Sequence, residues 1–119
     1  MIHLVWVFIG GGLGSICRFL AGELLKSNSL FFPWGTLLAN AISCIILGAL
    51  MAYNIKNPMG TSYRLFLMTG FCGGFSTFST FSGEIYVLLQ DGKLNLAFAY
   101  MGLSLVIGLL GIFLGFRLV

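Results

Sequence analysis

The sequence predicts an all-α integral membrane protein with four transmembrane helices. Of its 119 residues, 59% are hydrophobic and only 8% are charged, whereas a soluble domain carries roughly a quarter charged residues. A transmembrane helix needs about 20 mainly apolar residues, so four spans with short connections use nearly the whole length. The long apolar runs lack the period-2 alternation of a membrane β-barrel. We therefore expect a single four-helix transmembrane domain over residues 1–119.

The four spans are separated by short segments that favour turns. The segments KSNS, KNPMGTS and QDGK each combine turn-forming residues with a charge. Pro33 suits the start of the second span, because its missing N–H would have no helical partner there anyway. The expected spans cover residues 3–25, 33–55, 62–89 and 94–118.

The charges indicate little preference for one orientation in the membrane. With four spans, Lys56, Arg64 and Arg117 fall on one side, whereas Lys26 and Lys93 fall on the other. Three against two is almost no positive-inside bias, so copies of opposite orientation could pair. The alternative is one fixed orientation set by one or two charges. The net charge of +3 is small and spread along the sequence, and it does not indicate a nucleic-acid partner.

Glycine pairs four residues apart predict that the helices pack closely. Such pairs let helix backbones approach each other in membranes, although each is weak evidence alone because glycine is common there. The pairs are Gly10 and Gly14 in the first span, Gly70 and Gly74 in the third, and Gly111 and Gly115 in the fourth.

Three polar side chains within the spans are costly in lipid. Arg18 and Glu84 either pair with each other or reach the headgroups with their polar ends. Asn40 carries an amide with two donors and an acceptor. It acts either as a hydrogen-bonded link between helices or as the lining of a polar path.

The segment GGFSTFSTF, residues 73–81, begins with a pair of poor helix formers. Gly73 and Gly74 therefore predict a break in the third helix between residues 73 and 78. Broken backbone at membrane depth is tolerated only where protein or a water-filled cavity satisfies it. The freed carbonyl groups are hard oxygen ligands that suit a small alkali cation.

The same segment interleaves hydroxyl and phenyl side chains. Phe78 and Phe81 are three residues apart, so on a helix they share a face. The positive edges of phenyl rings, together with hydroxyl donors, suit a small anion that must be bound weakly enough to be released. The same spacing predicts two adjacent hydroxyl tracks, Ser76 with Ser79 and Thr77 with Thr80.

At this point the residues resemble a known family. TGFCGGFSTFSTFSGE, residues 69–84, is similar to the Fluc (CrcB) fluoride channel signature GFxGGxTTFSTFSxE. GGLGSICRF and GTLLANAISCIILG, in the first and second spans, resemble further segments of that family. The resemblance implies a dual-topology homodimer, with antiparallel subunits and two pores, in the cell inner (plasma) membrane. It implies passive, selective fluoride export without catalysis. Some relatives pair two different chains, so a heterodimer with a second chain is an alternative to the homodimer.

The resemblance also implies roles for individual residues. The break implies a structural Na⁺ at the dimer two-fold, held by the backbone carbonyls of Gly73 and Ser76 from both subunits. Ser76 stands where the family usually has Thr, but any residue supplies a backbone carbonyl, so the ligand is kept. Ala39 and Ser43 also depart from the family, and we expect them to lie away from the proposed site. Arg18 matches an arginine thought to attract anions at a vestibule. The implied fluoride-pore residues are Asn40, Phe78, Ser79, Thr80, Phe81 and Glu84, with Ser104 as a further candidate.

Three other functions are alternatives to a channel. A small multidrug-type proton-coupled exporter is also a short dual-topology dimer, but it needs an acid deep in the first helix. Here Glu23 is the only acid of that helix, and it lies near the end beside Lys26. A non-transporting assembly subunit would not require the hydroxyl and phenyl repeat. An enzyme is not expected, because the lone histidine, His3, is near the terminus and no nucleophile–base set is visible.

Overall fold

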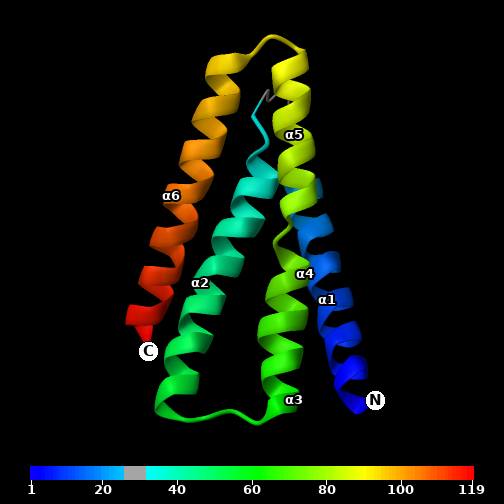
Figure 1. Ribbon diagram of the computed structural model, residues 1–119, viewed down its shortest axis with the longest axis vertical. Helices are drawn as coiled ribbons and strands as arrows, with labels where there is room; N and C mark the ends of the chain where they lie inside the picture. Colours follow the sequence, from blue (N-terminus) through cyan, green and yellow to red (C-terminus); the bar gives the residue numbers. More distant parts are fainter. Residues whose placement is uncertain (26–31) are drawn as a thin grey trace.

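The computed structural model describes residues 1–25 and 32–119, and the regular elements of these residues are helices. The chain runs back and forth along the long axis, and both termini lie at the same end (Figure 1). The elements are α1 (Ile2–Leu24), α2 (Trp34–Lys56), α3 (Thr61–Arg64), η1 (Leu65–Cys72), α4 (Gly73–Phe75), α5 (Phe78–Gln90) and α6 (Leu94–Leu118). The outer ends of the helical segments lie within one residue of the expected ranges. The turn expected at KSNS, residues 26–29, lies outside the described residues, as does Lys26.

Three helices, α1, α2 and α6, are long and apolar enough to cross a membrane. Large apolar side chains such as Phe8, Phe98 and Leu105 are exposed along them, as on a surface that faces lipid. Pro33 is the N-cap of α2, so it directly precedes the helix instead of forming its first residue. The third helical segment is divided into shorter elements, and none of these reaches the length of a membrane span by itself.

The third segment is interrupted at Ser76 and Thr77, inside the range where the sequence predicts a break. Ser76 has φ −87° and ψ 154°, and Thr77 has φ −152° and ψ 129°, so both are extended. The explanation from glycine was wrong, however, because Gly73 and Gly74 belong to α4 and are helical. Before α4, η1 is a π-helix of eight residues that the sequence analysis did not anticipate. π-helical turns of this kind often occur at functional sites.

The glycines instead allow α1 and the third segment to touch. A Cβ atom on Gly10 would lie 2.2 Å from the Phe66 carbonyl oxygen, and one on Gly14 would lie 2.2 Å from that of Phe71. The two glycines are four residues apart, whereas the two carbonyls are five apart, which is the hydrogen-bond spacing of a π-helix. On the other side, a Cβ on Gly74 would lie 2.4 Å from the Gly11 carbonyl oxygen. The close packing predicted from the glycine pairs is therefore confirmed for this helix pair.

Helices α2 and α6 are packed together in the same way. A Cβ atom on Gly115 would lie 2.0 Å from the Ile45 carbonyl oxygen, and one on Gly48 would lie 2.1 Å from that of Ile112. Gly111 also lies against α2. Between α5 and α6, Tyr100 is completely buried in a cluster with Leu37. The chain turns from α5 to α6 at Gly92, which has a φ of +76° that favours glycine.

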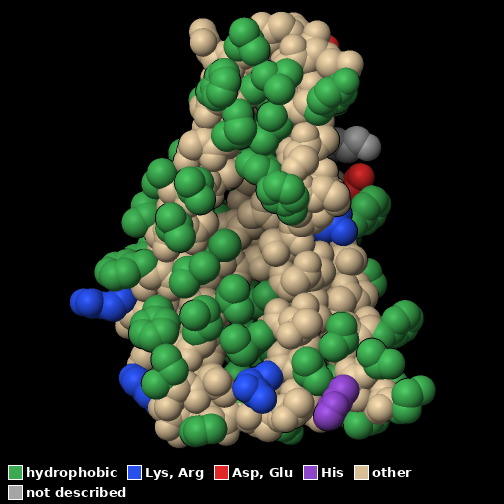
Figure 2. Space-filling view, in the orientation of Figure 1, with side chains coloured by type: hydrophobic (Ala, Val, Ile, Leu, Met, Phe, Trp, Pro, Cys, Tyr) green, Lys and Arg blue, Asp and Glu red, His purple; other side chains and the backbone are tan. Residues whose placement is uncertain are grey.

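The acids of the chain gather in one half of the molecule, whereas its cations occur in both halves. Lys56 and Arg117 lie in the last turns of α2 and α6, and Arg64 lies in α3, all toward the end that carries the termini. The acidic side chains visible on the face in Figure 2 all lie in the other half of the molecule. The three acids of the chain are Glu23, Glu84 and Asp91.

Candidate functional site

The interruption of the third segment is held in place by side chains of α1 and α2. In a continuous helix the Thr77 amide would donate to the Gly73 carbonyl, but here it donates to Asn40 Oδ1 at 3.2 Å. The Gly74 carbonyl would likewise accept from the Phe78 amide, but it accepts from Arg18 Nε at 3.3 Å. Two polar side chains therefore replace the helical hydrogen bonds that the break removes.

The contacts of Asn40 bear on its two expected roles, a hydrogen-bonded link between helices and the lining of a polar path. Its side chain forms a hydrogen bond between α2 and the third segment, and it also lines a cavity of about 490 Å³. The hydrogen-bonded link to another segment is therefore confirmed, whereas the lining of a polar path stays a prediction.

A second polar contact stabilises the turn just before the break. The Cys72 carbonyl accepts from the Ser76 amide at 3.1 Å, from Ser76 Oγ at 2.9 Å and from Ser43 Oγ at 2.9 Å. Ser43 is only 3% exposed. Ser43 was expected to lie away from the residues of the site. This expectation was wrong, because the Ser43 hydroxyl contacts the turn that leads into the interruption.

The cavity beside Asn40 brings together four of the expected pore residues, Asn40, Phe78, Phe81 and Ser104. It lies between α2, the interruption and α6, and Figure 2 shows a hollow in the middle of this face. The Ser104 hydroxyl oxygen is buried and has no hydrogen-bond partner within residues 1–25 and 32–119. A buried hydroxyl without a partner is costly, so it is available to a ligand. The remaining lining residues are Cys44, Ser76, Thr77, Met101, Leu105 and Gly108.

The two expected phenylalanines lie next to each other at this cavity. Their ring centroids are 6.0 Å apart with an interplanar angle of 48°, which agrees with the shared helix face. Phe81 continues into an edge contact with Tyr100, with centroids 5.0 Å apart at 62°. Phe78 is 78% exposed, so its ring projects from the surface of the single chain.

The two predicted hydroxyl tracks were wrong. Because Ser76 and Thr77 are extended, they leave the helical register that the spacing assumed. Thr77 Oγ1 and Ser79 Oγ lie 3.1 Å apart across the start of α5. Ser79 is exposed, and Thr80 lines a different cavity, the one beside Glu84.

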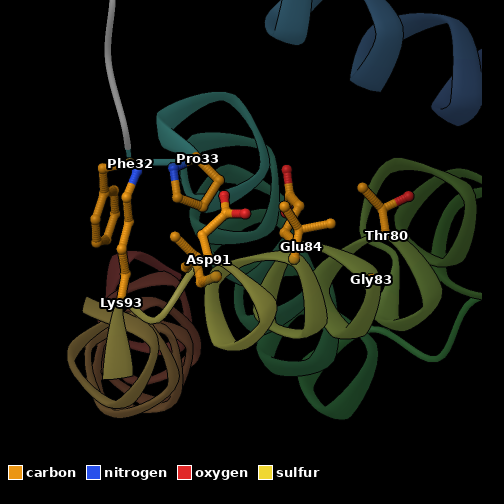
Figure 3. A pocket seen from close by; sticks show the side chains of 9 residues that line it. Phe32, Pro33, Thr80, Gly83, Glu84, Asp91 and Lys93 are labelled. Atoms are coloured by element: carbon orange, nitrogen blue, oxygen red, sulfur yellow. The ribbon is translucent and has the colours of Figure 1, made fainter. Parts of the chain in front are cut away.

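Glu84 and Arg18 have separate partners in the described part of the chain. Both carboxylate oxygens of Glu84 accept hydrogen bonds, from Thr36 Oγ1 at 2.9 Å and from the Tyr100 hydroxyl at 2.8 Å. The cavity beside Glu84 has a volume of about 560 Å³ and also contains Asp91. Figure 3 shows Thr80 and Glu84 on α5 and Asp91 directly after its end.

Arg18 lines a smaller hollow near the same residues. Its volume is about 190 Å³, and Thr36 and Thr80 also line it. A guanidinium group and hydroxyl donors thus lie close to the Glu84 cavity. The expected vestibule role of Arg18 stays a prediction, since its one hydrogen bond described here goes to the Gly74 carbonyl.

The sequence analysis missed Thr36 and Tyr100 as members of this site. Each precedes an expected pore residue by four positions, Thr36 before Asn40 and Tyr100 before Ser104. Residues four apart share a helix face, so this spacing could have identified them. The result is a run of polar groups along the facing sides of α2 and α6, which continues from the Asn40 cavity to Glu84.

The backbone at the interruption fits a hard cation with carbonyl ligands. The Gly73 carbonyl loses the donor of a continuous helix, because the Thr77 amide is diverted to Asn40. The Ser76 carbonyl lies between the end of α4 and the N-cap of α5. A Cβ atom on Gly73 would meet nothing within 4 Å, so this position is open on its outer side. Oxygen ligands of this type suit a hard cation.

Comparison with known proteins identifies the family of the chain. Residues 5–116 match the family described as CrcB-like protein, Camphor Resistance (CrcB). A Fluoride-specific ion channel FluC of Phocaeicola vulgatus is 40% identical, over 97% of this chain and 96% of that protein. The FluC proteins of Novosphingobium aromaticivorans and Pectobacterium atrosepticum are 41% and 43% identical, over 97% and 98% of this chain and 94% and 92% of their own lengths. The resemblance seen in the third-span motif is therefore confirmed, and the chain belongs to the CrcB-like family.

Proposed function

We propose that this chain forms a fluoride-selective channel that lets fluoride leave the cell passively and lowers its cytoplasmic concentration. The observation that carries the proposal is the cavity of about 490 Å³ in which Asn40, Phe78, Phe81 and Ser104 meet. These groups are uncharged, and together they offer amide and hydroxyl donors and the edges of phenyl rings. The relatives named as fluoride-specific channels support the same function.

The hydrogen-bond donors at this cavity suit an anion that is bound weakly and released, and not one that is held tightly. A small anion that loses its water must find donors of comparable number, but a tight cationic trap would bind it without releasing it. Ser104 offers a hydroxyl that has no partner among the described residues, and the ring of Phe81 is held against Tyr100. Such a path needs no chemical conversion, so the protein acts as a channel and not as an enzyme.

The path we propose continues from the Asn40 cavity toward Glu84. Tyr100 and Thr36 lie one helical turn from Ser104 and Asn40, and both donate to the Glu84 carboxylate. Thr80 and Arg18 then lead to the outer surface through the two neighbouring cavities. Ser79 is placed near the start of α5, where its hydroxyl contacts that of Thr77.

We further propose that two copies span the cell inner (plasma) membrane with four helices each and in opposite orientations. The exposed Phe78 ring and the open side of Gly73 support a second copy packed over the interruption. The carbonyls of Gly73 and Ser76 from both copies would hold a structural Na⁺ there. When bound, the cation would stabilise the crossing of the two interrupted segments by charge.

Fluoride efflux from liposomes tests the proposed function. Purified protein is reconstituted into vesicles loaded with fluoride, and release is followed with a fluoride electrode beside chloride-loaded vesicles. We expect rapid fluoride release without chloride release. No release of either ion, from protein shown to be folded and dimeric, would contradict the proposal.

A further inference from the structure

The cavity beside Glu84 is poorly suited to an anion if only one copy is considered. Two carboxylates, those of Glu84 and Asp91, line it together with one ammonium group, that of Lys93. Both oxygens of Glu84 accept hydrogen bonds, from Thr36 and from Tyr100. Figure 3 shows Glu84 and Asp91 on the same side of α5. Within this cavity the carboxylates outnumber the ammonium group, and Arg18 lies in the neighbouring hollow that Thr80 also lines.

The opposite end of the molecule carries cations but none of the three acids. It carries Lys56, Arg64 and Arg117, whereas the three acids of the chain lie in the other half. Lys56 Nζ donates to the Val119 carbonyl, and the Arg117 guanidinium lies over the Phe113 ring, 5.7 Å from its centroid.

Arg64 differs from the other two cations. Within residues 1–25 and 32–119, no hydrogen bond or ion pair engages its guanidinium group. It lines a cavity of about 290 Å³ with Thr61, Leu65, Met68 and Thr69.

The positions of the charges along the third segment match in an antiparallel pair. Arg64 precedes Ser76 by 12 residues (76 − 64), and Glu84 and Asp91 follow it by 8 and 15 (84 − 76 and 91 − 76). Counted in residues from the interruption, Arg64 is therefore farther away than Glu84 and nearer than Asp91. A two-fold axis at the interruption would bring Arg64 of one copy to a level between Glu84 and Asp91 of the other.

We infer that Arg64 of one copy completes the acid-lined cavity of the second copy and adds to Arg18 and Lys93 a further positive charge that favours the approach of fluoride. Each fluoride path would then use residues of both copies at its mouth, and the cavity of a single chain would be incomplete. This inference rests on the proposed function, because it requires two antiparallel copies. The position of all three acids in one half, the unengaged guanidinium and the matching positions along the third segment carry it.

Disulfide trapping tests the proximity directly. Arg64→Cys and Asp91→Cys are combined in a chain whose Cys17, Cys44 and Cys72 are changed to Ala. Residues 64 and 91 lie at opposite ends of one chain, so a disulfide between them must join two copies. We expect mild oxidation to give a covalent dimer on a non-reducing gel. The matched control, Arg117→Cys with Asp91→Cys, carries the same charge change on α6 and should stay unlinked. A link in the control alone, or no link in protein of dimeric mass, would overturn the inference.

A charge exchange tests the role in transport. We expect Arg64→Glu to lower the initial fluoride efflux by about tenfold, a range typical of steering charges, and added Asp91→Arg to restore most of it. Arg117→Glu makes the same charge change at the same end and should change efflux by less than about twofold. Because Arg117→Glu changes the charge of the same end, it shows whether efflux falls merely because the copies insert into the membrane with a different orientation.

The outcomes distinguish the two proposals. If unmodified protein releases fluoride but Arg64→Glu matches it, or if Asp91→Arg fails to restore the flux of Arg64→Glu, only the role of Arg64 is overturned. If unmodified protein releases no fluoride, the proposed function fails as well.

Discussion

Asn40 connects the backbone of the third segment to the cavity. Its side-chain oxygen accepts from the Thr77 amide, so it satisfies a donor that the break would otherwise leave without a partner. The same side chain lines the cavity where the phenylalanines and Ser104 meet. One residue therefore stabilises the interruption and contributes to the proposed anion path.

Two substitutions at Asn40 should separate these roles. Asn40→Ala removes the acceptor and should lower the free energy of unfolding by about 1–3 kcal/mol, the cost of an unsatisfied buried donor. Asn40→Asp keeps an acceptor oxygen, so it should stay more stable than Asn40→Ala. Its negative charge should nevertheless abolish fluoride flux. Thermal unfolding in detergent and vesicle efflux measure the two effects, and normal flux through Asn40→Asp would contradict the pore role.

Phe81 tests whether a ring edge contributes to conduction. Phe81→Ile keeps an apolar side chain but loses the ring, and aromatic edge interactions are worth about 0.5–1.5 kcal/mol. Because each 1.4 kcal/mol corresponds to about tenfold in rate, fluoride efflux should fall by a few-fold to tenfold while the dimer stays intact. Phe113→Ile, at an exposed position of α6, is the control. Unchanged efflux from Phe81→Ile would remove the ring from the mechanism.

At the scale of single residues, the sequence analysis identified side chains whose type is unusual in a membrane. Asn40 and the phenylalanines at 78 and 81 could be predicted because their types and spacing stand out, and they meet at one cavity. Tyr100 was missed because its role depends on contacts with Glu84 and Phe81, which come from another helix. Contacts between helices leave only a weak trace in the sequence, here a four-residue spacing.

At the scale of elements, the third segment combines a π-helix with an extended interruption. The positions of the helices could be predicted from the apolar runs and the turn-forming residues between them. The π-helix could not, because it depends on how the carbonyls of residues 66 and 71 meet the glycines of α1. For the same reason Gly74 was assigned a role in breaking the helix, whereas it allows contact with Gly11.

Alanine substitutions in α1 test this packing. A Cβ atom on Gly14 would lie 2.2 Å from the Phe71 carbonyl oxygen, whereas one on Gly12 would meet nothing within 4 Å. Overpacking typically costs about 1–3 kcal/mol, so Gly14→Ala should lower the midpoint of thermal unfolding and the yield of folded protein. Gly12→Ala should be neutral or slightly stabilising, because alanine favours helices. Equal behaviour of the two variants would show that the contact does not support the fold.

At the scale of the whole molecule, the charges favour an assembly of two antiparallel copies. One end carries Lys56, Arg64 and Arg117 without an acid, whereas the other contains all three acids together with cations such as Arg18 and Lys93. Two copies in opposite orientations would therefore place the acids of each copy at the same end as these three cations of the other. Counting Lys and Arg alone gave nearly no difference between the sides, and the segregation became visible only with the acids and the fold. Opposite charges at this spacing would also guide the two copies into register.

Removal of Na⁺ tests the site proposed at the centre of this assembly. When Na⁺ is replaced by a large organic cation, the carbonyls of Gly73 and Ser76 would face each other without a counter-charge. The dimer should then weaken or its fluoride conduction should fall, and returning Na⁺ should restore both. Size-exclusion chromatography and vesicle efflux provide the readouts. Full conduction by an intact dimer after exhaustive Na⁺ removal would contradict the carbonyl site.

The most direct test of passive fluoride conduction is the reversal potential of the current through the protein in a planar bilayer. With fluoride at different concentrations on the two sides, we predict a reversal potential that changes by about 59 mV for each tenfold fluoride gradient, as for one elementary charge. Chloride and proton gradients should leave it unchanged. A reversal potential that follows the proton gradient, or protein that is folded and dimeric but carries no fluoride current, would contradict the account.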